Sequence, residues 1–276
     1  MLRRKVSGFH IFNYAFLSLL ILVCIAPILH VIALSFSQKI EAVAGHVGLL
    51  PVGFNVEAYR YVMEDSQFWT SLGVTLLRVV IGVPVNIFLV VMTAYPLSKS
   101  NSRFHARTVF AWFFAFTMYF SGGQIPLYIV ISKLKMINTI WALTLPGAMN
   151  VSYMILMLNF FRSIPTEIED AATIDGASEL RTFNTIVFPM VKPGVGALAI
   201  FTFINSWNDY FMQLIMLSSN ANYTISLGIA TLQAESSIDM GLLMAGAALA
   251  AAPIIAVFLV FQKYFTKGIT MGAVKG

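Results

Sequence analysis

The sequence has few charged residues and a single cysteine. Charged side chains make up 11% of the 276 residues, whereas hydrophobic side chains make up 58% and the mean hydropathy is +0.81. This balance excludes a soluble globular domain and indicates an integral membrane protein. The lone Cys24 excludes an internal disulfide. The net charge of +5 therefore indicates basic residues at a membrane surface and not affinity for nucleic acid.

Sequence motifs of catalysis and metal binding are also missing. No G-x-x-x-x-G-K-[ST] motif occurs, so the chain has no P-loop for a nucleotide. Neither a G-x-S-x-G elbow nor a pair of catalytic carboxylates is present. The four histidines show no metal-ligand spacing and are expected to be structural or at the surface: His10, His30, His46 and His105. We therefore expect no enzyme activity, no cofactor and no metal, and the energy for any work has to come from a gradient or a partner.

Six apolar stretches are long enough to cross a membrane, which takes about 20 helical residues. The expected spans are 11–34, 72–95, 108–131, 140–160, 194–217 and 241–262. The segments between them are too short to form a second domain with its own core. The prediction is an all-α, polytopic membrane protein with one transmembrane domain over residues 1–276.

The distribution of basic residues predicts the orientation of the chain. The segments on one side of the six spans carry twelve Lys and Arg residues, and those on the other side carry four. The basic side comprises 1–10, 96–107, 161–193 and 263–276, and the other side comprises 35–71, 132–139 and 218–240. Because cytoplasmic loops are enriched in Lys and Arg, both termini are predicted to face the cytoplasm.

An acidic segment at 164–193 interrupts the apolar chain with the sequence IPTEIEDAATIDGASELRTFNTIVFPMVKP. Thr166 and Glu169 have the spacing of a capping box, which predicts the start of a helix. Gly176 predicts its end, because glycine readily adopts the left-handed conformation that closes helices. One face of this helix has small side chains and the other is acidic, with Ile168, Ala171, Ala172 and Asp175 on the first and Glu167 and Asp170 off it. A helix lying on the membrane would carry basic residues on its polar face, so the acidic face favours a groove in another protein.

This segment resembles the conserved cytoplasmic loop of binding-protein-dependent ABC importer permeases. The family pattern E-A-A-x-x-x-G, followed by I-x-x-P, is matched from Asp170 to Gly176 and from Ile186 to Pro189, with Asp170 where the family usually has Glu. In that family the loop forms a coupling helix in a groove of the cytosolic ATPase. The resemblance therefore implies an ATPase-coupling role for Glu169, Asp170, Ala171, Ala172, Asp175, Gly176 and Ala177.

Further motifs resemble the second, six-span permease of carbohydrate importers, in the oligosaccharide branch related to the maltose type. They lie at 94–99, 121–126, 146–148, 159–161, 207–209 and 272–276. The resemblance implies import of a carbohydrate, such as an oligosaccharide with or without uronates, into a bacterial cell through the cytoplasmic membrane. It implies as partners a homologous permease, two cytosolic ATPase subunits and an extracytoplasmic solute-binding protein. Candidate contacts to that receptor are Asn222, Tyr223, Gln233 and Glu235.

Charged residues and a helix break inside the spans suggest a translocation path. Asp209 follows Trp207 and Asn208, and this triplet is suited either to binding sugar hydroxyls or, as we favour, to tying helices together. Arg78 is suited to reaching the outer interface or to pairing with Asp209. The break at 122–126 either lines the path or is a simple kink. The candidate path residues are Gly122, Gly123, Gln124, Trp207, Asn208 and Asp209.

Two alternatives remain open at this point. One is an ABC permease for amino acids or peptides, against which the motifs of the sugar branch argue. The other is a gradient-driven secondary transporter with Asp209 as its ion-coupling carboxylate. Such transporters have inverted repeats with paired broken helices, whereas only one clear break is visible in the sequence.

Overall fold

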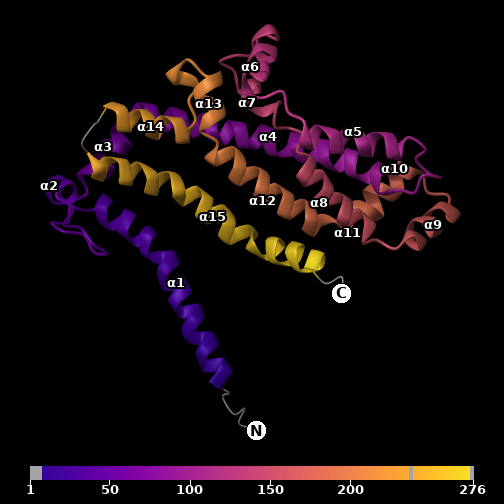
Figure 1. Ribbon diagram of the computed structural model, residues 1–276, viewed down its shortest axis with the longest axis horizontal. Helices are drawn as coiled ribbons and strands as arrows, with labels where there is room; N and C mark the ends of the chain where they lie inside the picture. Colours follow the sequence, from indigo (N-terminus) through magenta and orange to yellow (C-terminus); the bar gives the residue numbers. More distant parts are fainter. Residues whose placement is uncertain (1–7, 236–238, 274–276) are drawn as a thin grey trace. The chain divides into compact units, whose positions relative to one another are not determined.

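The computed structural model describes residues 8–235 and 239–273, and the side chains of 8–231 and 239–262. Every regular element within those residues is a helix, and the described part of the chain contains no strand (Figure 1). The prediction of an all-α protein is therefore confirmed.

Three helices are long and apolar enough to cross a membrane. They are α1 (Gly8–Ser35), α4 (Ser66–Ser98) and α15 (Met240–Ala273), the last counted to Gln262. They contain the predicted spans 11–34, 72–95 and 241–262. Many large apolar side chains on α1 are exposed, including Phe12, Leu19 and Leu22. Such a surface fits contact with lipid or with another subunit.

The other three predicted spans are broken helices. The 108–131 stretch forms α5 (Arg107–Tyr119) and α6 (Gln124–Lys133), and the chain bends by 113° between them, next to Gly123 with φ +83°. The 140–160 stretch divides into α7 (Ile140–Thr144) and α8 (Val151–Arg162). The 194–217 stretch divides into α12 (Lys192–Asn208) and α13 (Phe211–Met216). The described residues therefore hold three to five candidate spans, and six spans stay a prediction.

Shorter helices connect these elements. On the N-terminal side they are α2 (Lys39–Val43) and α3 (Glu57–Glu64). The acidic segment holds α9 (Thr166–Ile174), α10 (Glu179–Thr182), the π-helix η1 (Phe183–Val187) and α11 (Phe188–Met190). The helical run 179–190 bends by 73° into α12. The 3₁₀-helix η2 (Asn220–Asn222) precedes α14 (Ile225–Glu235).

The chain divides into two compact units. Unit 1 comprises 1–69 and 228–252, and its small core includes Ala33, Leu34 and Val47. Asp239 accepts a hydrogen bond from the Leu242 amide at 3.1 Å and so caps α15. Unit 2 comprises 70–227 and 253–276, and its main core joins α4, α8 and α12, with members such as Val90, Ala94, Met157, Phe161 and Leu198. Both candidate sites lie in unit 2.

Candidate functional site

Helix α9 ends as the sequence predicts but begins differently. At its end, Gly176 has φ +76° and its amide donates to the Thr173 carbonyl at 3.0 Å. At its start, the N-cap is Pro165 and no side chain caps the helix. The predicted capping box of Thr166 and Glu169 is therefore wrong. The reason is that the Glu169 carboxylate has stronger, charged partners elsewhere in the fold.

Those partners form a charged cluster, defined by Lys99, Arg103, Glu169 and Asp170. The Lys99 Nζ donates to both carboxylate oxygens of Glu169 at 2.5 Å. Arg103 donates to Glu169 at 3.2 Å through one guanidinium nitrogen and to Asp170 through the other. The side chains of Lys99 and Glu169 are only 12% and 9% exposed, and Lys99 also lies 3.9 Å above the Tyr95 ring. The cluster thus attaches α9 to the segment that follows the end of α4.

The predicted coupling residues divide into two groups in the structure. Glu169 and Ala172 are buried against the rest of the chain, and Ala172 is 5% exposed. Asp170, Ala171, Asp175 and Gly176 are exposed, Ala177 is half-buried, and Ile174 is 86% exposed. The small face is therefore split, because Ala172 packs inward while Ala171 faces outward. The coupling role of these residues stays a prediction.

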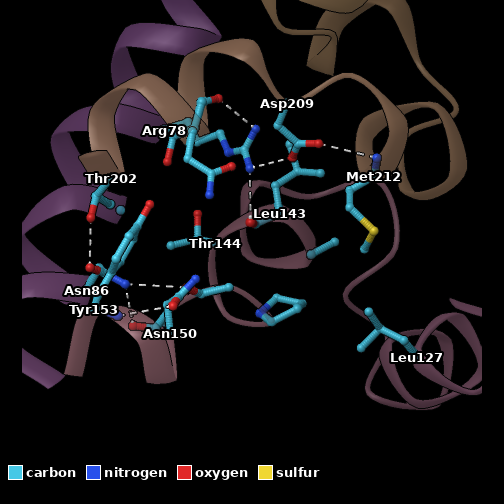
Figure 2. A pocket seen from close by; sticks show the side chains of 17 residues that line it. Arg78, Asn86, Leu127, Leu143, Thr144, Asn150, Tyr153, Thr202, Asp209 and Met212 are labelled. Carbon is cyan, nitrogen blue, oxygen red and sulfur yellow. Dashed lines mark hydrogen bonds and ion pairs between the residues drawn. The ribbon is translucent and has the colours of Figure 1, made fainter. Parts of the chain in front are cut away.

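A polar cavity of about 310 Å³ forms the second candidate site (Figure 2). Its walls come from α4, α7, α8 and α12 and from the connection between α7 and α8, and α6 and α13 each contribute one residue. The lining residues are Arg78, Gly82, Asn86, Leu127, Ala142, Leu143, Thr144, Pro146, Gly147, Ala148, Asn150, Tyr153, Thr202, Asn205, Ser206, Asp209 and Met212. This volume is at the lower end of the range for ligand sites, roughly 300–1,000 Å³.

Arg78 and Asp209 lie side by side in the lining of this cavity (Figure 2). A guanidinium nitrogen of Arg78 lies 2.7 Å from the Asp209 carboxylate, and Arg78 also donates to the carbonyls of Ser206 at 3.0 Å and Leu143 at 3.3 Å. The hypothesis that these two charges pair is confirmed. Because Arg78 is only 5% exposed, the expectation that it reaches an outer interface is wrong. The pair joins α4 to the end of α12 and balances two buried charges.

Asn86 connects three walls of the cavity. Its amide nitrogen donates to the carbonyls of Ala148 at 2.8 Å and Gly147 at 3.4 Å, and its oxygen accepts from the Thr202 hydroxyl at 2.9 Å. With 3% exposure and both amide N–H groups engaged, Asn86 supports the walls and offers a ligand no free donor. The sequence analysis missed this residue, although a polar amide in the middle of an apolar span is a signal for a helix-joining contact.

The predicted path residues take different positions. Asp209 lines the cavity, whereas Trp207 is 2% exposed and packs against Phe203 with ring centroids 5.3 Å apart. Asn208 is exposed and is not part of the lining. Gly122, Gly123 and Gln124 are also exposed and outside the lining, to which their segment contributes Leu127. Trp207 is therefore unavailable for stacking on a sugar in this conformation.

The predicted receptor segment is mostly helical. Asn222 donates to the Asn138 carbonyl at 2.7 Å, and Tyr223 packs on the cluster that includes Ile131 and Met216. Gln233 and Glu235 belong to α14, and their side chains lie outside the described residues. A role in receptor contact stays a prediction for all four residues.

Comparison with known proteins places this architecture in a family. The family model described as "Binding-protein-dependent transport system inner membrane component" matches residues 106–271. Protein LplC of Bacillus subtilis (strain 168) is 34% identical over 97% of this chain and 95% of its own length. The polygalacturonan/rhamnogalacturonan transport system permease protein YtcP of the same organism is also 34% identical, over 97% of this chain and 98% of its own length.

A solved structure extends the likeness to three dimensions. A chain of a bacterial ABC transporter involved in the import of the acidic polysaccharide alginate superposes with a TM-score of 0.83. The two chains are 29% identical, and the match covers 96% of this chain and 99% of the other. This protein therefore belongs to the family of binding-protein-dependent transport system inner membrane components, and it is a membrane permease and not an enzyme.

Proposed function

We propose that this chain is one of the two permeases of a type I ABC importer that carries a carbohydrate into a bacterial cell. The observation that carries the proposal is the likeness, along almost the full length of both chains, to a permease chain of an alginate importer. A relative named for polygalacturonan and rhamnogalacturonan transport supports an oligosaccharide as the substrate class. The import then depends on a homologous second permease, two cytosolic ATPases and an extracytoplasmic binding protein.

In this proposal α9 is the coupling helix. Its exposed Ala171, and the exposed Gly176 that follows its end, are available to a groove of an ATPase. The charged cluster ties α9 to the end of α4, and the same α4 carries Arg78 and Asn86 in the cavity wall. Movement of α9 on ATP binding is thereby transmitted through α4 to the cavity. Both termini of the chain lie in the cytoplasm in this proposal. The chain performs no covalent step of its own.

The two alternatives receive less support. An ion-coupling carboxylate has to bind and release its ion, whereas Asp209 is paired with Arg78 at 2.7 Å and also accepts from the Met212 amide at 3.4 Å. Releasing Asp209 for an ion would leave Arg78 unpaired in a buried position. An amino-acid or peptide permease is disfavoured because the relatives described above include a permease named for polygalacturonan and rhamnogalacturonan transport.

Co-purification and reconstituted uptake test the proposal. A tagged chain extracted from its native membrane is expected to bring down a second permease and an ATPase in stoichiometric amounts. Proteoliposomes of that complex are expected to accumulate a radiolabelled oligosaccharide only with the binding protein outside and ATP inside. Uptake that needs an ion gradient and no ATP would overturn the proposal in favour of a secondary transporter.

A further inference from the structure

The cavity in unit 2 offers a ligand no unpaired charge from the described residues that line it. Its only charged side chains are Arg78 and Asp209, which pair with each other at 2.7 Å. The other guanidinium contacts are to backbone carbonyls. A ligand carboxylate that drew Arg78 away would leave Asp209, which is 16% exposed, without its counter-charge. The cavity is therefore poorly suited to an acidic group.

Neutral polar groups are available instead. Tyr153 lines the cavity with its ring stacked on Phe201, centroids 6.1 Å apart, and no hydrogen bond within the described part of the chain engages its hydroxyl. Asn150 uses its side-chain oxygen to cap α8, which leaves its amide N–H groups for a ligand. Asn205 contributes a second, exposed amide. Such groups both donate and accept, as sugar hydroxyls do.

Apolar side chains complete the lining. Figure 2 shows Leu127 and Met212 on the side of the cavity opposite Tyr153 and Asn150. A pyranose ring has a rim of hydroxyls and two faces of C–H groups, so it can meet both walls at once. Ligand sites commonly combine an apolar surface with a few placed polar groups. The volume of about 310 Å³ suits a short end of a carbohydrate and excludes a long segment.

We propose that this cavity is a subsite for a neutral glycosyl unit, which it recognises through hydroxyl groups and not through a carboxylate. This inference rests on the proposed carbohydrate import and narrows the class of sugar unit that the cavity accepts. Tyr153 donates to or accepts from a hydroxyl of the sugar, Asn150 donates to another, and the Arg78–Asp209 pair keeps the site electrically neutral. A sugar unit that carries a carboxylate at the same position is rejected, because the site has no free cation to pair with it.

Matched pairs of oligosaccharides test this inference on the complete importer in lipid nanodiscs, without the binding protein. The pairs are galactotriose with trigalacturonate and mannotriose with trimannuronate, which differ only in the acidic groups. Binding is measured by saturation-transfer NMR titration. We expect at least one neutral member to bind about tenfold more tightly than its acidic counterpart, and Tyr153→Phe to weaken that binding roughly fivefold, as loss of one hydrogen bond does. Tyr128→Phe, on α6 and outside the cavity lining, is the matched control and should change nothing.

Asp209→Asn supplies the converse measurement. It removes the counter-charge of Arg78, so binding of the acidic member should improve relative to the neutral one. Equal or tighter binding of the acidic member by the unaltered complex overturns the inference. So does a Tyr153→Phe variant with unchanged affinity, or a complex that binds neither pair while it still imports carbohydrate with its binding protein. In the last case the proposed function survives, whereas loss of all carbohydrate uptake in the reconstituted assay would reject that function itself.

Discussion

Removing Lys99 tests whether the charged cluster holds α9 in place. Loss of one partner from a buried ion pair costs about 3–5 kcal/mol, because the other charge is left buried. In Lys99→Met, Glu169 keeps Arg103 at 3.2 Å, but Arg103 is 36% exposed and its contribution is screened to about 0.5–1 kcal/mol. We therefore expect Lys99→Met to destabilise the chain by about 2–4 kcal/mol. Glu169→Gln removes the carboxylate that pairs with Lys99 and is expected to cost a similar amount.

The double variant Lys99→Met/Glu169→Gln separates charge from packing. It removes both buried charges, so its cost should be smaller than the sum of the two single variants by about 1–3 kcal/mol. Lys39→Met is the matched control, because Lys39 pairs with Asp239 at 3.1 Å while 60% exposed, and it should cost at most about 1 kcal/mol. The measurement is thermal unfolding of the purified complex, together with uptake per ATP hydrolysed. The reasoning is refuted if Lys99→Met costs no more than Lys39→Met, or if the single-variant costs simply add.

Two further predictions concern the exposed face of α9 and the cavity pair. Ala171→Glu should leave the fold intact, because Ala171 is exposed, and should break the coupling of ATP hydrolysis to uptake. Ala172→Glu should instead lower the yield of folded protein, because Ala172 is only 5% exposed. Equal yields with equal uptake would contradict both statements. Arg78→Asp and Asp209→Arg should each reduce uptake at least tenfold, since each replaces the attraction of this pair by the repulsion of two like charges beside the cavity. The double swap should restore part of the uptake. A double swap no more active than either single variant would show that the pair is not the reason for the loss.

The sequence was sufficient to predict the fold class and the pairing of Arg78 with Asp209. An apolar stretch of about 20 residues predicts a helix directly, because backbone N–H and C=O groups in lipid have to form their hydrogen bonds within the segment. The sequence also identified the break at 122–126, where α5 and α6 are bent by 113°, but it was not sufficient for the breaks in the other two spans. The 140–160 stretch has the length and composition of one span, yet its helix is interrupted at Pro146 and Gly147. The Gly147 carbonyl then accepts a hydrogen bond from the side chain of Asn86 in α4. A broken helix of this kind depends on a distant partner for its free backbone groups, and periodicity within the stretch carries no information about that partner.

The wrong prediction of a capping box at Glu169 has the same cause, because a local pattern does not show partners that are distant in the sequence. Its spacing from Thr166 satisfies the local rule for a capping box, but the rule ignores competing partners. Lys99 and Arg103 precede it by 70 and 66 residues in the sequence and reach it in the fold. A charged hydrogen bond is about twice as strong as a neutral one, so the Glu169 carboxylate binds Lys99 and Arg103 and does not cap the helix. The acidic face that favoured a protein groove is thus partly used inside the chain, because Asp170 pairs with Arg103, whereas Glu167 on that face is exposed.

Helix α4 is the element that can join the two candidate sites. A helix rises about 1.5 Å per residue, so the 22 steps from Leu77 to Lys99 span about 33 Å between the cavity end of α4 and the charged cluster. If the cluster makes α9 and α4 one rigid body, spin labels at Leu77 and Ala171, both exposed, should keep one sharp distance when ATP binds to the complex. The labels are attached after Leu77→Cys and Ala171→Cys in a Cys24→Ala background, and the distance is measured by pulsed electron paramagnetic resonance. Lys99→Met should broaden that distribution. A distance that already changes with ATP in the unaltered cluster would mean that α9 moves independently of α4, and motion would then have to reach the cavity through α12.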